Sequence, residues 1–299
     1  MRLEVMGAGQ MAEALVRAIL DGGLLSPAQV TAIDPAPERR AVFASLGCQA
    51  AERHLADDVF DAILLAVKPQ QAEEALGAIA AGHAGAPLLI SVMAGVATSR
   101  LAASCPRFRV IRAMPNLPAA VGAGATGVAL GPGATEDDMR LALRLFSAGG
   151  KAWQVDESML DAVTAVSGSG PAYFFRLTEA LAEAGRAAGL PPDVADGLAR
   201  ETLWGAAMLL RGSPDSPAAW RGRVTSPGGT TAAAMAVLDG EGEGPGAAAH
   251  ALSGSDVNAG DPSGAGRGER QAGGRMAVLV REAVFAARRR AGELSAAAH

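Results

Sequence analysis

The sequence is poor in aromatic residues, cysteines and positive charge, and each shortage excludes a class of protein. Aromatic residues make up only 4% of the 299 residues, so the cores must be built from Ala, Leu and Val. The two cysteines, Cys48 and Cys105, form no closely spaced pair, and we expect them to be buried thiols in a reduced compartment. A net charge of −5 argues against a nucleic-acid or anionic-membrane partner.

Long apolar runs and clustered metal ligands are also missing. No apolar stretch reaches the roughly eighteen residues that a membrane span needs. Because a strand pattern begins almost at the first residue, no signal peptide is predicted, and we expect a cytoplasmic protein. The four histidines, His54, His83, His250 and His299, show no ligand spacing, so we expect them at the surface and predict no metal site.

The most informative stretch is a glycine turn near the N-terminus, between an apolar run at 3–6 and a helical pattern at 11–20. Gly7 permits a tight turn, Gly9 lets the backbone approach a phosphate, and Ala12 keeps the helix close to the strand. The free N–H groups of the helix N-terminus favour an anion there. The turn therefore predicts a dinucleotide site whose residues are Gly7, Ala8, Gly9, Gln10, Met11 and Ala12.

The choice between NADH and NADPH is open at the end of the second strand, predicted at 29–33. Asp34 follows that strand, where a carboxylate would bind the ribose hydroxyls of NADH and repel the 2′-phosphate of NADPH. Arg39 and Arg40 come directly after it and could instead pair with that phosphate. They are equally well explained as the solvated face of a helix.

The first half of the chain alternates strand and helix patterns, which predicts an α/β fold with a doubly wound sheet over residues 1–158. Cofactors lie at the ends of parallel strands, so residues 66–69 should border the dinucleotide. The further strands are predicted at 62–67, 88–93, 109–114, 128–130 and 152–155, with a helix over 135–146.

Strand patterns are missing from the second half, which predicts an all-α domain over residues 159–299. The apolar period is helical at 171–189 and 192–210, with a proline near each start. A last helix is predicted at about 276–294, with Arg281, Arg288, Arg289 and Arg290 on its polar side.

Two polar turns interrupt the helical half, at 167–171 and 225–231, and each precedes a helix. Helix N-termini and hydroxyls bind anions, although ordinary capping explains either turn by itself. Because both turns follow a nucleotide domain, they favour a site for a substrate carboxylate.

Residues 240–274 are unlike the rest of the chain. Eleven of these 35 residues are glycine, none is aromatic and very few are aliphatic. Such a segment cannot bury enough apolar surface to offset the entropy of ordering, so it is predicted to be a disordered insertion.

Several motifs together resemble the pyrroline-5-carboxylate reductase family. The turns at 166–173 and 225–231 carry the resemblance, with the strand-end motifs at 66–69 and 112–118. The resemblance covers about residues 1–238 and resumes in the last helix. It implies a Rossmann domain, a helical domain through which subunits associate, and reduction of 1-pyrroline-5-carboxylate to L-proline with NADPH or NADH.

The resemblance also implies roles for individual residues. Thr231 would be the catalytic residue, with its hydroxyl on the ring nitrogen, and the substrate would be held by residues of the 225–231 turn. The implied substrate-binding residues are Glu157, Ser226, Gly228, Gly229, Thr230 and Thr231. Beyond the glycine turn, the implied cofactor-binding residues are Asp34, Ala66, Val67, Lys68, Pro69, Ala94, Gly95, Val96 and Asn116.

Two features depart from the family pattern: the long insertion at 240–274, and a carboxylate at Asp34 where the family often has a small polar residue. One alternative is a related β-hydroxyacid-type dehydrogenase, but that chemistry generally needs a lysine in the second domain, and no lysine follows Lys151. The other alternative is a non-catalytic dinucleotide sensor in which the insertion blocks turnover.

Overall fold

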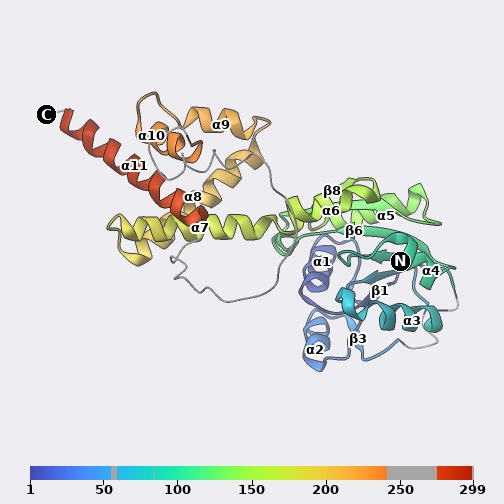
Figure 1. Ribbon diagram of the computed structural model, residues 1–299. Helices are drawn as coiled ribbons and strands as arrows, with labels where there is room; N and C mark the ends of the chain where they lie inside the picture. Colours follow the sequence, from blue (N-terminus) through green and yellow to red (C-terminus); the bar gives the residue numbers. More distant parts are fainter. Residues whose placement is uncertain (55–58, 84, 241–274, 298–299) are drawn as a thin grey trace, which may run out of the picture. The chain divides into compact units, whose positions relative to one another are not determined.

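The computed structural model describes residues 1–54, 59–83, 85–240 and 275–297 (Figure 1). It forms two compact units, Met1–Pro171 and Ala172–His299. Apart from Gly240, the predicted insertion at 240–274 lies outside the described residues, as do His250 and His299. The division into functional domains of 1–158 and 159–299 stays a prediction.

Unit 1 contains an eight-stranded sheet in the order β3-β2-β1-β4-β5-β6-β7-β8. The central strands β1, β2, β4 and β5 are buried along their whole length, as their apolar sequences require with helices on both faces. The strands are β1 (Leu3–Met6), β2 (Val30–Ile33), β3 (Gln49–Ala51), β4 (Ala62–Leu65), β5 (Leu88–Ser91), β6 (Arg109–Met114), β7 (Gly124–Leu130) and β8 (Gly150–Gln154).

The helices of unit 1 make two apolar layers with the sheet. Side chains of α1, α2 and α5 pack against one face of the sheet and form with it a core that includes Leu15, Phe43 and Phe146. Side chains of α3 and α4 pack on the other face around Leu76 and Leu101. The helices are α1 (Gln10–Asp21), α2 (Pro37–Ser45), α3 (Ala72–Gly82), α4 (Thr98–Ser104), α5 (Glu136–Ser147) and the single turn α6 (Leu160–Val163).

The doubly wound sheet is confirmed, with one reversal of direction. All paired neighbours are parallel except β6 and β7, which are antiparallel. Only residues 115–123 connect these two strands, and a parallel crossover needs about a dozen residues or more. The short strand β3 was not predicted, because Gln49–Ala51 has no apolar alternation.

Surface placement, expected for the histidines, is wrong for two of them. His83 is 4% exposed and lies at the end of α3, and the side chain of His54 is 6% exposed. Both contact Glu4 in the middle of β1, a carboxylate that is itself fully buried. A buried carboxylate requires polar surroundings, and His54 supplies one hydrogen-bond partner, to Glu4 Oε1 at 2.7 Å.

Unit 2 is helical, as predicted. It consists of α7 (Gly170–Ala187), which begins at the end of unit 1, α8 (Pro192–Gly212), α9 (Pro217–Arg223), α10 (Thr230–Leu238) and α11 (Arg275–Ala297). Its small core joins α7 to α11 through Ala180, Ala184, Ala277 and Val280. No helix in the described part of the chain is both long and apolar enough to cross a membrane.

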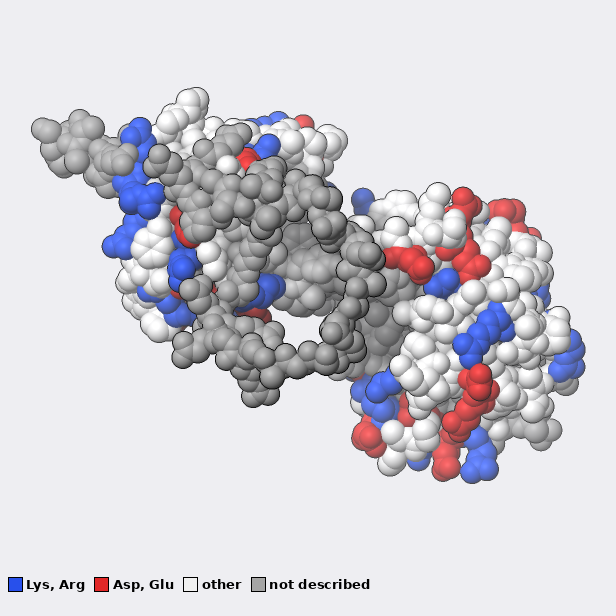
Figure 2. Space-filling model, viewed as in Figure 1, with Lys and Arg blue, Asp and Glu red and all other residues white. Residues whose placement is uncertain are grey.

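Charged side chains are distributed differently over the two units (Figure 2). On the drawn face of unit 1, acidic and basic side chains are intermixed. In unit 2, basic side chains gather along α11, where Arg281, Arg288 and Arg289 are exposed. The predicted polar side of the last helix is therefore confirmed for these three arginines.

Candidate functional site: a dinucleotide turn and an anion-binding turn

The glycine turn joins β1 to α1 as the sequence predicts. Gly7 has a φ of +91°, and a Cβ there would lie 2.8 Å from Val67 Cγ1 and 2.9 Å from the Ala66 carbonyl carbon. Gly9 is the N-cap of α1, and a Cβ there would meet nothing within 4 Å. No side chain of the described residues caps this helix end, and an uncapped helix N-terminus after a glycine turn suits a phosphate.

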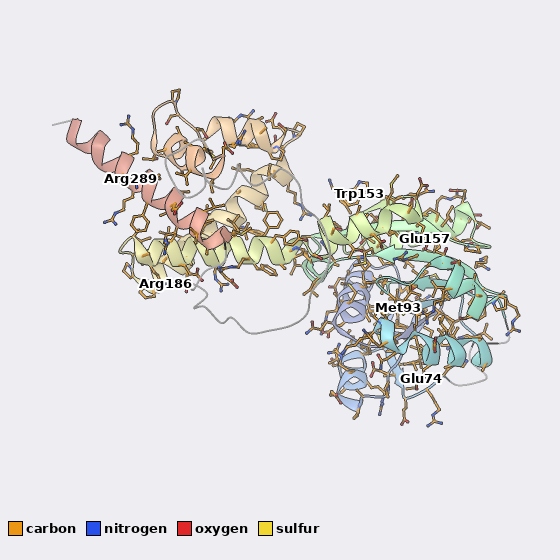
Figure 3. The ribbon with its side chains drawn as sticks, in the orientation of Figure 1. Glu74, Met93, Trp153, Glu157, Arg186 and Arg289 are labelled. Atoms are coloured by element: carbon orange, nitrogen blue, oxygen red, sulfur yellow. The ribbon has the colours of Figure 1, made fainter. Side chains whose placement is uncertain are left out.

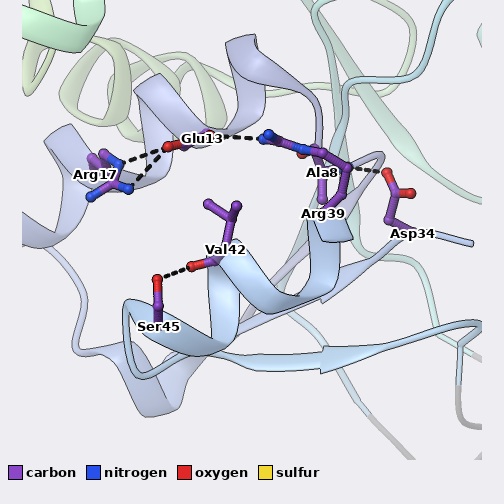
Figure 4. Close-up of polar contacts among 7 residues, drawn as sticks. All are labelled: Ala8, Glu13, Arg17, Asp34, Arg39, Val42 and Ser45. Atoms are coloured by element: carbon purple, nitrogen blue, oxygen red, sulfur yellow. Dashed lines mark hydrogen bonds and ion pairs between the residues drawn. The ribbon is translucent and has the colours of Figure 1, made fainter. Parts of the chain in front are cut away.

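Asp34 is fixed beside this turn at the end of β2 (Figure 4). Its Oδ2 accepts a hydrogen bond from the Ala8 N–H at 2.8 Å, and its Oδ1 accepts one from the Ala36 N–H at 2.9 Å. The carboxylate therefore fixes the backbone of the glycine turn. Its predicted contact with the adenosine ribose, and its effect on the choice between NADH and NADPH, stay predictions.

Arg39 and Arg40 both bond to the chain around the glycine turn. Arg39 donates from Nε to the Ala8 carbonyl at 2.6 Å and from a terminal nitrogen to Glu13 at 2.8 Å (Figure 4). That bond to Arg39 holds the pKa of Glu13 below its ordinary value, against the smaller effect of burial. Arg40 donates to the carbonyls of Asp34 and Pro35.

The other strand-end residues lie along the carboxyl edge of the sheet. Lys68, Pro69, Ala94 and Gly95 are exposed, and Ala66 and Val67 are half-buried. Val96 differs, because its side chain is 3% exposed and packs in the core with α3 and α4. At Val96, only the backbone is left to meet a cofactor.

Asn116 joins three segments through its side-chain amide. The amide nitrogen donates to the Ser167 carbonyl at 2.9 Å, and the amide oxygen accepts from the Ala125 N–H at 2.8 Å. The residue is 7% exposed, so these bonds fix the end of β6 against β7 and a π-helix at Thr164–Gly168. The turn predicted at 167–171 is wrong, because this π-helix runs almost directly into α7. Its predicted contact with the cofactor stays a prediction.

Glu157 lies in unit 1 (Figure 3), where three donors bind its carboxylate. Its Oε1 accepts from the Thr98 N–H at 2.7 Å and from Arg112 at 3.2 Å, and its Oε2 accepts from the Thr98 hydroxyl at 2.6 Å. Burial acts to raise the pKa of Glu157, but the bonds from Thr98 and Arg112 outweigh it and lower the pKa. Both oxygens are thus used within the protein, and the predicted substrate contact stays a prediction.

In unit 2, the turn at 225–231 ends at the N-terminus of α10. Gly228 has a φ of +67°, Gly229 is the N-cap, and the Gly229 N–H donates to the Ser226 carbonyl at 3.0 Å. Thr230 and Thr231 are half-buried in the first turn of α10, and no side chain of the described residues caps the start of this helix. A helix N-terminus with threonines in its first turn is an arrangement that suits a carboxylate.

An arginine that bonds to this turn was not among the predicted site residues. Arg290 of α11 donates from Nε to the Gly228 carbonyl at 2.6 Å, across 62 residues of sequence. Its guanidinium adds positive charge next to the helix N-terminus and fixes the turn. The sequence signal was only a run of arginines on the last helix, with nothing to indicate which one reaches the turn.

A doubly wound sheet with a glycine turn before its first helix, followed by a helical unit, is typical of dinucleotide-dependent oxidoreductases. Two family models match parts of the chain. Residues 2–95 match the description "NADP oxidoreductase coenzyme F420-dependent", and residues 157–255 match "Pyrroline-5-carboxylate reductase dimerisation".

Relatives that match most of the chain identify its family more specifically than the two family models do. The chain is 40% identical to a pyrroline-5-carboxylate reductase of Synechocystis sp. over 240 residues, covering 80% of this chain and 90% of the relative. It is 41% identical to that of Arabidopsis thaliana over 238 residues, covering 78% and 86%. The chain belongs to the pyrroline-5-carboxylate reductase family.

The architecture agrees with this membership. A solved pyrroline-5-carboxylate reductase from Coxiella burnetii superposes with a TM-score of 0.75 at 27% identity, covering 97% of both chains. The enzyme from Streptococcus pyogenes superposes with a TM-score of 0.69 at 28% identity, covering 83% of this chain and 95% of the other. The predicted family and fold class are confirmed.

Proposed function

We propose that this chain reduces 1-pyrroline-5-carboxylate to L-proline with a hydride from NADPH or NADH, the last step of proline biosynthesis. The observation that carries the proposal is the 225–231 turn at the start of α10, in a chain that matches 90% of the length of a relative named for this reaction. The open glycine turn of unit 1 supports the need for a dinucleotide.

The chemistry requires positioning more than acid–base catalysis. When bound, the nicotinamide would supply a hydride to the imine carbon; the electron pair of the C=N π bond passes to the ring nitrogen, which takes a proton from solvent. The N–H groups of Thr230 and Thr231 bind the substrate carboxylate. The Thr231 hydroxyl bonds to the ring nitrogen as that nitrogen becomes an amine.

The proposed sites follow the two turns. In unit 2, the substrate meets Ser226, Gly228, Gly229, Thr230 and Thr231, and Glu157 of unit 1 remains a candidate contact. In unit 1, the dinucleotide meets Gly7, Ala8, Gly9, Gln10, Met11, Ala12, Asp34, Ala66, Val67, Lys68, Pro69, Ala94, Gly95, Val96 and Asn116.

Oxidation of NADH and of NADPH by the purified chain, with and without pyrroline-5-carboxylate, tests the proposal. We expect substrate-dependent oxidation and formation of proline. Cofactor binding without turnover would instead support the dinucleotide sensor, and turnover of a hydroxyacid alone would support the related dehydrogenase.

Thr231→Ala is expected to lower kcat by about 10-fold, the scale of one well-placed hydrogen bond to the transition state. Thr231→Ser is the matched control, because it retains the hydroxyl and should keep kcat within a few-fold of the parent. Steady-state kinetics at saturating cofactor measure both. An unchanged kcat in folded Thr231→Ala would remove the hydroxyl from the mechanism.

Asp34→Ser is expected to raise the kcat/KM for NADPH relative to that for NADH, because it removes a negative charge facing the 2′-phosphate. The substitution also weakens the bond to the Ala8 N–H, which affects both cofactors. The ratio of the two kcat/KM values therefore isolates the charge effect. A ratio equal to that of the parent would show that Asp34 acts only on the turn.

We also propose that unit 2 mediates self-association as a homodimer or larger oligomer of a cytoplasmic enzyme. Large apolar side chains of α7 and α8 are exposed, among them Phe174 at 56%, Phe175 at 60% and Trp204 at 63%. Apolar area of this kind is typical of subunit interfaces. Sedimentation equilibrium would test the assembly, and a monomer at micromolar concentration would contradict it.

A further inference from the structure

We propose that Glu4, His54 and His83 form a buried site for a divalent transition-metal ion of the zinc class. One carboxylate oxygen and one imidazole nitrogen from each histidine lie within 4.8 Å of one another. Two imidazoles and a carboxylate are a ligand set that zinc uses in proteins. The three residues come from β1, the loop after β3 and the end of α3.

In each histidine, the ring nitrogen that faces away from Glu4 (the outer nitrogen) contacts a carbonyl. This contact directs the other ring nitrogen (the inner nitrogen) toward Glu4. His54 Nε2 lies 3.0 Å from the Gly82 carbonyl, and His83 Nδ1 lies 3.0 Å from the Ile79 carbonyl. A nitrogen facing a carbonyl must carry the proton, so in neutral imidazoles the inner nitrogens present lone pairs. Metal-binding histidines are commonly oriented in this way, by a carbonyl on the second nitrogen.

Two of the inner atoms are left without a hydrogen bond in the described part of the chain. His83 Nε2 and Glu4 Oε2 are 2.9 Å apart, yet neither makes a hydrogen bond of acceptable geometry within the described residues. Buried polar atoms without partners are rare in native proteins and call for an ion or a water. An ion among the three ligands satisfies both atoms.

Protons account for the cluster less well than a metal does. Glu4 can receive a donor from each histidine, with both carbonyl hydrogen bonds kept, only if both imidazoles are charged. The two ring centroids are 4.0 Å apart, so that state places two positive rings in contact in a buried place. One divalent ion supplies the same charge while both imidazoles stay neutral.

The surroundings favour a cation and exclude bulk water. The carbonyls of Ile79 and Gly82 belong to the last turn of α3, and the carboxyl end of a helix attracts positive charge. The rings of Phe60 and Phe108 lie 6.0 Å from His54 and 6.1 Å from His83. An apolar shell of this kind strengthens metal–ligand bonds.

Metal binding requires only a small local adjustment. His54 Nδ1 now lies 2.7 Å from Glu4 Oε1, whereas two ligands on a tetrahedral zinc ion are about 3.3 Å apart. Rotation of the Glu4 carboxylate and of the His54 ring supplies this opening. Three protein ligands leave the fourth position to a water.

The test is titration of the untagged full chain, freed of metal by a chelator, with Zn²⁺ alone in isothermal calorimetry. We expect uptake of one equivalent and a rise in Tm of about 5 °C at saturation. Co²⁺ should give the visible absorption of a tetrahedral nitrogen–oxygen site. Absence of uptake by the parent chain would overturn the proposal and leave the three groups as holders of protons.

Variants assign the ion to this site. His83→Gln and Glu4→Gln should each weaken Zn²⁺ binding by at least about 100-fold. Gly82→Ala should also weaken Zn²⁺ binding, although it keeps all three ligands. A Cβ at residue 82 would lie 2.6 Å from His54 Cδ2 and displace the ring.

The matched control removes the other two imidazoles of the chain, as His250→Gln with His299→Gln, and should bind Zn²⁺ like the parent. Loss of binding in this control, or parent-like binding in His83→Gln, would overturn the assignment. Because the readouts are metal uptake and Tm, the result does not depend on the proposed reductase activity.

Discussion

Gly7→Ala is expected to lower the affinity for NADPH and NADH by about 100-fold or more and to destabilise unit 1 by about 2–3 kcal/mol. At a φ of +91° a side chain is strained, and the new Cβ would lie 2.9 Å from the carbonyl carbon and oxygen of Ala66. Backbone atoms of the neighbouring strand end cannot rotate away, so the turn itself must move. Fluorescence titration of NAD(P)H and urea unfolding measure the two effects.

Gly9→Ala is the matched control for the glycine turn, because it separates the cofactor from the fold. Gly9 has an ordinary φ of −68°, and its Cβ would project into open space, so the free energy of unfolding should fall by at most about 1 kcal/mol. Cofactor affinity should still fall by about 10-fold, since that space is where the pyrophosphate lies. Parent-like affinity in Gly9→Ala would contradict this placement.

Glu157→Ala is expected to destabilise unit 1 by about 2 kcal/mol, since it leaves Arg112 without its nearest carboxylate in the protein interior. The Arg112 side chain is 9% exposed, and Asp161, at 3.9 Å, is the other ion-pair partner the structure records. Removal of one partner of a fully buried ion pair typically lowers the free energy of unfolding by about 3–5 kcal/mol. The loss is smaller here because Glu157 is partly exposed. Urea unfolding of unit 1 measures the loss.

The lowered pKa of Glu157 predicts that the stability of unit 1 depends on pH. Because the folded state lowers the pKa of Glu157 from 4.5, its contribution is complete above about pH 4.5 and disappears as the pH falls through the lowered value. Glu157→Gln should therefore be less stable than the parent at pH 7, with the difference shrinking toward pH 3. If Glu157 instead acts only on the substrate, Glu157→Gln will raise KM and leave the unfolding midpoint unchanged.

The local features of both candidate turns could be read from the sequence. The glycine turn lies between β1 and α1, and the 225–231 turn ends at the start of α10, as their strand and helix patterns predict. The buried strands and the change to helices in the second half follow from the same signals. Side-chain periodicity, capping and glycine conformation depend on neighbours a few residues apart, so a single sequence contains them.

The tertiary structure alone decided which distant side chains meet. His54 reaches Glu4 across 50 residues, Thr98 reaches Glu157 across 59, and Arg290 reaches Gly228 across 62. Strand order and helix packing bring these partners together, and no local pattern records them. For this reason the sequence by itself predicted the two turns, but not the buried histidine cluster or the bonds that occupy Glu157.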